Sequence, residues 1–368
     1  MISVIDRYIL RSLLTNYLIA MGTMLSLYVA LDLFVNMDEF TEKGYSLPIV
    51  LRNMADFYWP NLLLYFKELS SAITLFACVA TLGRMRKLHE LTAVLASGVS
   101  LYRIAAPVVG FGVATTAFLV LDTEVFIPPV AHRLARDHDD ADGTRAYQVL
   151  FLRDRDNRLL SAARFSPSTQ DLSRLLVITR DEHGDMTDML EADRAQWQPP
   201  GATQPHGRWK LDRGRRTSRV RTAAAGLGPT ERKTVEYPAY YESDLSPEAI
   251  QLRQSEGWMR FLSLSQLDEL EAIAGPNRAA VIQSKHARHT APLVSLVMLL
   301  LGIPFFLQRS PEQMISDAGK CMVVCGLCYV VTLVAQGIHP AGASALPAWI
   351  PIFVFGTLAV VLIDRIRT

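Results

Sequence analysis

The stretch Trp59–Val109 decides the fold, and it reads WPNLLLYFKELSSAITLFACVATLGRMRKLHELTAVLASGVSLYRIAAPVV. An apolar run of membrane-spanning length ends in the basic sequence Arg84-Met85-Arg86-Lys87, and a second apolar run begins near Ile104. Between the two runs, residues 87–100 have the composition of a short helix that carries one acidic residue, Glu90. Because a basic turn marks the cytoplasmic side of a membrane protein, this helix is predicted to dock to a soluble partner in the cytoplasm.

The whole chain divides by composition. Half of the 368 residues are hydrophobic, and the net charge is only +1. Long apolar runs fill residues 1–128 and 290–368, whereas residues 129–289 are polar and charged, with frequent Pro and Gly. A helix needs about 20 mostly apolar residues to cross a hydrocarbon core of about 30 Å. Six segments come close to that length, at residues 12–35, 59–83, 101–123, 290–308, 316–338 and 346–364.

The positive charges predict how the chain crosses the membrane, because Lys and Arg in short loops stay in the cytoplasm. Both termini are then cytoplasmic, and the insert faces the periplasm. The first apolar run lacks a small-residue cleavage site and is longer than the apolar core of a signal peptide, so it is predicted to be a retained span. With six spans, the cations that fall on one side are Arg7, Arg11, Arg84, Arg86, Lys87, Arg103, Arg309, Arg365 and Arg367.

The insert is rich in predicted strands. Short runs of β-branched and aromatic residues occur at 146–152, 175–179 and 208–211, with turn-forming residues between them. The predicted fold class is a polytopic α-helical membrane protein with six transmembrane helices and an inserted periplasmic all-β domain between the third and fourth spans. The strand pattern of this domain predicts an antiparallel sandwich or a jelly-roll-like fold. The predicted domains are 1–128 with a cytoplasmic coupling helix at about 84–100, 129–289 with a flanking helical segment, and 290–368.

The sequence lacks the motifs of a nucleotide-binding site and of a zinc-protease site. It has no Gly-x-x-x-x-Gly-Lys-Ser/Thr loop for a nucleotide phosphate, and His89-Glu90 lacks the second histidine of a zinc-protease helix. We therefore expect no catalytic residue, no cofactor, no metal and no nucleic-acid partner for this chain. Any ATP and Mg would bind to a partner ATPase.

Two groups of residues suggest a metal or redox site at first sight. His286 and His289 could share a helix face, but tetrahedral sites need three or four ligands, so a membrane-edge anchor is favoured. Cys321, Cys325 and Cys328 share one face of the fifth span, where cysteine as a small packing residue is favoured over a thiolate site.

Ionisable residues within membrane spans suggest a function, because they are costly there. Lys67 and Glu68 interrupt the second span. In one interpretation, this span begins near Leu69 and Lys67 lies at the outer membrane–water interface. The other directs Lys67 into an internal cavity, where it attracts an anionic headgroup, and makes it the candidate substrate-binding residue. Asp122 and Glu124 are expected to be solvated, because the third span is predicted to end beside them.

Several short motifs occur in order on this frame of three spans, an insert and three spans. They are Asp6-Arg7-Tyr8, Leu82-Gly83-Arg84-Met85, His89-Glu90-Leu91, Ala96-Ser97-Gly98, Leu190-Glu191-Ala192-Asp193-Arg194-Ala195, Gly207-Arg208-Trp209-Lys210-Leu211 and Arg288-His289-Thr290-Ala291-Pro292-Leu293. Together they resemble the LptF/LptG family, the permease subunits of the lipopolysaccharide-export ABC transporter, over nearly the whole length. Asp6-Arg7-Tyr8 and Phe34-Val35-Asn36-Met37 are closer to the LptG type.

The resemblance implies a set of roles. The helix between the second and third spans would dock in a groove of a cytoplasmic ABC ATPase dimer, with Glu90 accepting bonds from the partner and Leu88, Leu91 and Leu95 seating the helix. His89 and Gly98 belong to the same segment. The resemblance also implies an inner-membrane location, a paralogous permease subunit or a homodimer around a cavity lined by the first and fifth spans, and a periplasmic jellyroll bridge protein. The substrate would be lipopolysaccharide or a related glycolipid.

Basic residues near the outer end of the first span are few, so no lipid contact is assigned there. Two other functions stay open. A permease of a different envelope lipid, lipoprotein or peptide ABC exporter would share the docking helix but have another outward fold. A non-transporting, membrane-anchored envelope scaffold or sensor would use no ATP, and substitution of Glu90 would then be harmless.

Overall fold

The computed structural model describes residues 4–41, 46–136, 140, 145–156, 158–181, 185–201, 207–222, 230–255, 257–273, 278–307, 314–337 and 345–364. Arg309, Arg365 and Arg367, on which the predicted topology partly depends, lie outside the described residues. The chain forms two compact units. The helical unit comprises Met1–Met37, Tyr58–Val130 and Met259–Thr368, and the β unit comprises Asp38–Phe57 and Ala131–Trp258.

Six helices are long and apolar enough to cross a membrane, so the predicted number of spans is confirmed for the described chain. The third span extends beyond its predicted end, because α5 continues without a break through the π-helical turn η1 into α6. The helix of the second span begins at Leu47, earlier than predicted, so Pro60 lies inside this helix rather than at its start. The spans are α1 (Val4–Val35), α3 (Leu47–Lys87), α5 (Leu101–Leu121) with η1 (Asp122–Phe126) and α6 (Ile127–Leu134), α9 (Arg278–Phe306), α10 (Met314–Gly337) and α11 (Leu346–Asp364).

The remaining helical segments are short. They are α2 (Met37–Thr41), α4 (Glu90–Ala96), α7 (Pro247–Gln254), η3 (Trp258–Phe261) and α8 (Leu264–Ile273).

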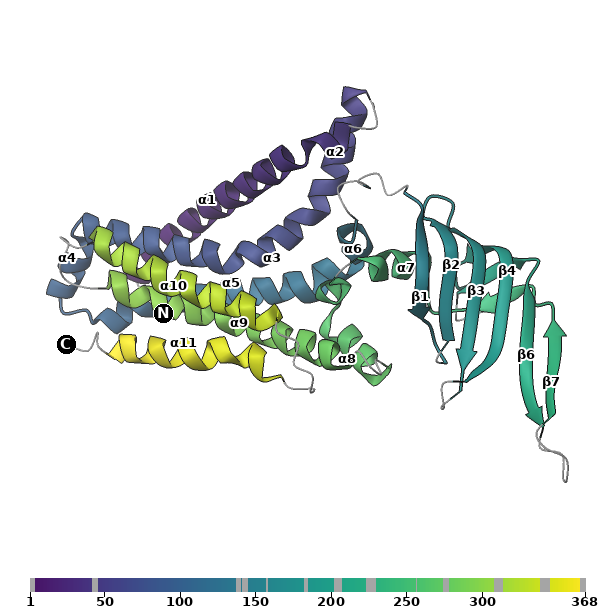
Figure 1. Ribbon diagram of the computed structural model, residues 1–368. Helices are drawn as coiled ribbons and strands as arrows, with labels where there is room; N and C mark the ends of the chain where they lie inside the picture. The colour runs from purple at the N-terminus through teal and green to yellow at the C-terminus, as the bar shows by residue number, and fades with distance from the viewer. Residues whose placement is uncertain are drawn as a thin grey trace. The chain divides into compact units, whose positions relative to one another are not determined.

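Packing in the helical unit is centred on α9. This helix contacts α5, α8, α10 and α11, and 61% of the residues in its most apolar 18-residue stretch are buried. By contrast, only 6% of the residues in the corresponding stretch of α1 are buried, and α1 lies along the edge of the helices in Figure 1. Small residues let α9 approach its neighbours: a side chain at Gly302 would overlap the Leu75 side chain of α3. The unit is therefore a packed group of helices with one loosely attached member, α1.

The β unit contains one eight-stranded antiparallel sheet, so the predicted β insert between the third and fourth spans is confirmed (Figure 1). The strands follow the order β1-β2-β3-β4-β5-β8, and the first half of β4 pairs with β6, which pairs with β7. β4 is long enough to hold two different partners, one along each half. The strands are β1 (Tyr147–Arg153), β2 (Arg158–Ser166), β3 (Asp171–Arg180), β4 (Met186–Gln198), β5 (Arg208–Asp212), β6 (Arg215–Thr222), β7 (Thr230–Glu236) and β8 (Tyr240–Glu242).

One face of the sheet covers an apolar core with a polar cluster at its border. Trp209 is fully buried in this core, and its indole N–H donates to the Leu245 carbonyl at 3.2 Å. The buried Asp154 carboxylate accepts hydrogen bonds from the Tyr241 hydroxyl at 2.7 Å and from the Asp244 backbone N–H at 3.1 Å. Burial and the nearby Asp154 charge raise the pKa of Tyr241. These buried polar groups are thus paired, as a stable core requires.

Candidate functional site

The coupling segment, residues 84–100, joins α3 to α5 at one end of the helical unit (Figure 1). α3 ends at Lys87, and His89 takes the left-handed conformation (φ 58°), which redirects the chain before α4 begins at Glu90. Gly98 (φ 85°) ends the segment in a conformation that suits a residue without a Cβ. The Ser100 side chain then accepts a hydrogen bond from the Arg103 N–H and caps α5. α4 therefore lies within the predicted segment, but it covers only Glu90–Ala96 of residues 84–100.

The Glu90 side chain contacts the start of the first span. The Tyr8 hydroxyl lies 3.0 and 2.9 Å from the two Glu90 carboxylate oxygens, so it donates one hydrogen bond shared between them. Two residues before Tyr8, Asp6 accepts from Arg103, whose Nη2 lies 2.8 Å from Asp6 Oδ2. Glu90 and Arg103 therefore both bond to the Asp6-Arg7-Tyr8 motif, a connection between residues about 80 to 100 positions apart that sequence reasoning missed.

The predicted leucines of the coupling segment lie in different surroundings. Leu91 is 2% exposed and belongs to the core formed with α3, α5 and α9. Leu95 is half-buried against the same core, whereas Leu88 is 53% exposed. The outward surface of the segment is formed by its exposed residues, which are Arg84, Lys87, Leu88, His89, Thr92, Ala93, Ala96, Ser97, Gly98 and Ser100. This exposed surface is the part of the segment that another protein could contact in the described chain, and its docking role stays a prediction.

A buried ion pair underlies the coupling segment. Arg86 Nη1 and Nη2 each lie 3.0 Å from Asp317 Oδ2, and both side chains are 2% exposed. Arg86 Nη1 also donates to the Phe305 carbonyl at 3.3 Å, near the end of α9, where helix carbonyls lack internal partners. The pair thus ties the end of α3 to the end of α9 and the start of α10. One weak signal for this pair was present in the sequence, because Asp317 is an acidic residue in the first turn of an otherwise apolar span.

Lys67, midway along α3, lies in a charged cluster with groups from α9, η1 and η3. Its Nζ donates to the Arg260 carbonyl at 3.3 Å, and Arg288 Nε lies 3.5 Å from Glu124 Oε1. The expectation that Asp122 is solvated is wrong, because this residue is 1% exposed inside a helix that continues past it. Glu124 is also mostly buried, at 22% exposure of its side chain. Anion binding by Lys67 stays a prediction.

The other two candidate groups are packing contacts in the described structure. Trp349 Nε1 lies 3.4 Å from His286 Nδ1, and the rings of His286 and His289 are 6.4 Å apart. Cys321 and Cys325 are buried with their Sγ atoms 4.0 Å apart, in the core between α9 and α10. Among the described residues, no group of three or more His, Cys, Asp or Glu could hold a metal ion.

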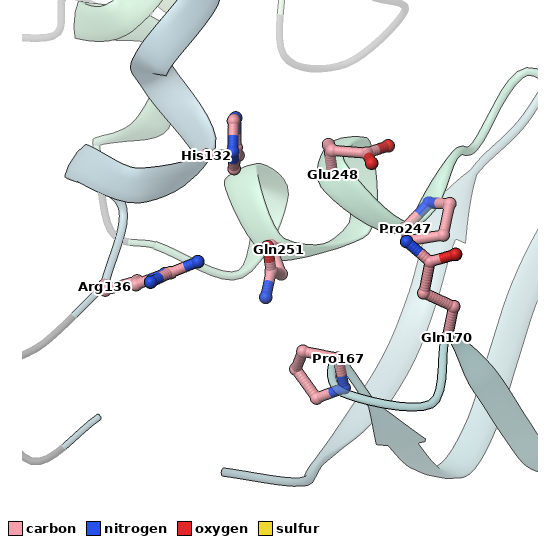
Figure 2. A pocket seen from close by; sticks show the side chains of 7 residues that line it. All are labelled: His132, Arg136, Pro167, Gln170, Pro247, Glu248 and Gln251. Carbon is pink, nitrogen blue, oxygen red and sulfur yellow. The ribbon is translucent and has the colours of Figure 1, made fainter. Parts of the chain in front are cut away.

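The β unit has a polar pocket that no sequence prediction had indicated. Figure 2 shows it between the end of α6, the β2–β3 turn and α7, where basic, acidic and amide side chains face a common space. The residues that line it are His132, Arg136, Pro167, Gln170, Pro247, Glu248 and Gln251. It contains none of the predicted site residues.

The comparison with protein families identifies a family for this chain. The model of the family described as lipopolysaccharide export system permease LptF/LptG matches residues 7–365, nearly the whole chain. The matched range includes all six spans, the coupling segment and the sheet. A comparison with curated proteins gives no match.

Proposed function

Because the chain belongs to the LptF/LptG family of lipopolysaccharide export permeases, we propose that a separate ABC ATPase drives it to extract lipopolysaccharide from the outer leaflet of the inner membrane. The chain is a multi-pass membrane protein and a permease component rather than an enzyme. ATP and Mg would bind to a cytoplasmic ATPase dimer. The observation that carries this proposal is the coupling segment, whose outward surface is exposed while its inner side is fixed to the spans.

The coupling segment has the chemistry of a docking site. A carboxylate has about four lone-pair sites, and Tyr8 supplies a single O–H to Glu90, so acceptor capacity is left for an arginine or backbone donor of the ATPase. The exposed Leu88 adds an apolar contact at the same end. Exposed Arg84 and Lys87 beside it support a cytoplasmic position for this end, since such cations resist translocation.

The exposed spans suggest where lipid and a second permease subunit bind. α1 exposes Leu27, Leu31 and Phe34, and α10 exposes Met322 and Val323. Apolar side chains on these helices fit acyl chains or another membrane helix equally well. We propose that α1 and α10 face a paralogous subunit, or a second copy of this chain, around a cavity that accepts the lipid.

The sheet offers a route for the lipid beyond the membrane. Among the described strands, β7 pairs only with β6, so its second edge has backbone groups that another strand could pair with. Strand addition at a sheet edge is a common way to join β domains. We propose that the sheet faces the periplasm and continues there into a bridge of similar domains.

The test is co-purification with the ATPase subunit from the same genome, followed by an ATPase assay. Wild-type chain should retain the ATPase, and Glu90→Arg should lose it or lose its stimulated activity, because a cation replaces the acceptor at the docking surface. Glu269→Arg in α8 is the matched control: it reverses an exposed charge far from the coupling segment and should behave as wild type. If wild-type chain retains no ATPase under conditions that preserve other such complexes, the ATP-driven function is wrong.

A further inference from the structure

The start of α1 is bonded to the coupling segment rather than only to its neighbouring spans. We name the two contacts Tyr8–Glu90 and Asp6–Arg103 the α1 anchor. The first contact joins α1 to α4 of the coupling segment, and the second joins the first turn of α1 to Arg103 in the first turn of α5, directly after that segment. Arg7, between them in sequence, is exposed and faces away from the buried stripe of α1. The Asp6-Arg7-Tyr8 motif thus uses two of its three side chains in these contacts.

The rest of α1 is attached along a narrow stripe. Its buried residues Ile9, Leu13, Tyr17 and Ala20 recur at helical spacing and all lie in the half nearest the coupling segment. Beyond them, Met21, Met24 and Leu25 are partly buried against the cluster that includes Phe66 and Ile73 of α3. Further along, the rings of Tyr28 and Tyr65 lie 4.4 Å apart, and the Tyr58 hydroxyl donates to Asp32 at 2.9 Å. A helix of 32 residues is about 48 Å long, so a small rotation near Ile9 moves its far end by a larger distance.

These observations point to a mechanical role for the motif. We propose that Tyr8 and Asp6 are positioning residues that make α1 move together with the coupling segment. The inference rests on the proposed function, in which an ATPase displaces that segment. Glu90 then has two partners at once, the ATPase on its outward side and Tyr8 on its inward side. Displacement of α4 carries the start of α1 with it, and the exposed outer half of α1 swings relative to α10.

The contacts do not hold the fold. The Arg103 side chain is 52% exposed and the Asp6 side chain is 13% exposed, so the pair is only partly buried, and solvent around the arginine limits its contribution to stability. Tyr8 is 45% exposed, and loss of its hydroxyl leaves the Glu90 carboxylate at the surface, where water can bind it. Variants of the α1 anchor should therefore fold normally, and only the coupling between the motion of the coupling segment and that of α1 should be lost. A purely structural role of these residues would not predict this outcome.

The experiment measures motion and ATP hydrolysis separately. Spin labels on cysteines introduced at Leu31 of α1 and Leu333 of α10, both exposed, report the distance between the outer halves of these helices. The complex with the ATPase is studied in lipid nanodiscs, without nucleotide and after trapping with ATP and vanadate. The variants are Tyr8→Phe, Asp6→Asn and the double variant. Tyr102→Phe is the matched control, because Tyr102 is 51% exposed and lies close to the coupling segment in sequence.

The expected result is equal ATPase binding in all variants, with a nucleotide-dependent distance change in the double variant that is less than half of the wild-type change. The charge-swapped Asp6→Arg, Arg103→Asp chain should recover most of the change, whereas Asp6→Arg alone should not. Tyr102→Phe should match wild type. If the double variant binds the ATPase and shows the full distance change, the inference is overturned while the proposed function stands. If wild-type chain does not bind the ATPase, the proposed function fails first and the inference falls with it.

Discussion

Arg86→Ala should lower the thermal stability of the helical unit strongly. The substitution leaves the Asp317 carboxylate, 2% exposed, with only the partly exposed Lys320 ammonium at 3.3 Å as a described ionic partner. Removal of one member of a buried ion pair costs about 3–5 kcal/mol, and the released Phe305 carbonyl adds about 1 kcal/mol. At about 2–4 °C per kcal/mol for a unit of this size, we expect the Tm in detergent to fall by roughly 8–24 °C.

The comparison variants make this reasoning refutable. Arg86→Leu combined with Asp317→Leu removes both charges, so its Tm should return to within a few degrees of wild type, because no charge is then left buried without its partner. Arg84→Ala, on the exposed side of the same helix end, should change the Tm little. The measurement is tryptophan fluorescence during heating. If Arg86→Ala and the double variant lose the same stability, the cost does not come from an uncompensated charge, and the argument is wrong.

Two further predictions concern packing and pH. Gly302→Ala should destabilise the helical unit by about 1–3 kcal/mol, because the new Cβ overlaps the Leu75 side chain. Gly110→Ala is the control and should not destabilise it, because a Cβ there has nothing within 4 Å. Thermal melts that show equal effects for the two variants would contradict the packing argument. The β unit should lose stability as the pH rises above about 10. The pKa of Tyr241 in the folded chain is raised above its unfolded value of about 10. Above that pH the tyrosine ionises in the unfolded chain while the folded chain still holds the neutral hydroxyl, and this difference favours unfolding. Urea unfolding at pH 8 and pH 11 checks this. Tyr241→Phe should reduce the pH effect but not abolish it, because burial also raises the pKa of Tyr147 in the same unit. An unchanged effect in Tyr241→Phe would exclude Tyr241 as a source.

The number of spans and the presence of a β insert could be predicted because both depend on local composition. Apolar runs report helix length, and alternating runs bounded by turns report strands. The short helix beginning at Glu90 was also predictable, because it lies between a basic turn and the next apolar run. What composition does not report is where a helix continues beyond its apolar part, which is why the end of the third span and the burial of Asp122 were missed.

The contacts of the site could not be predicted from one sequence. Arg86 looked like one more cytoplasmic cation, and its partner Asp317 is 231 positions away. Leu88 and Leu91 are the same residue type three positions apart, but one is exposed and the other fills a core built from distant helices. Periodicity predicts that a helix has an apolar face, and only the tertiary structure shows what covers that face.

The burial of all four cysteines makes the wild-type chain a ready background for surface chemistry. Cys78, Cys321, Cys325 and Cys328 are free thiols inside the helix packing, where a water-soluble maleimide cannot reach them. A single cysteine introduced at Leu88 would then be labelled without any prior removal of native thiols. Labelling in intact cells compared with inverted membrane vesicles would report directly on which side of the bilayer the coupling segment lies.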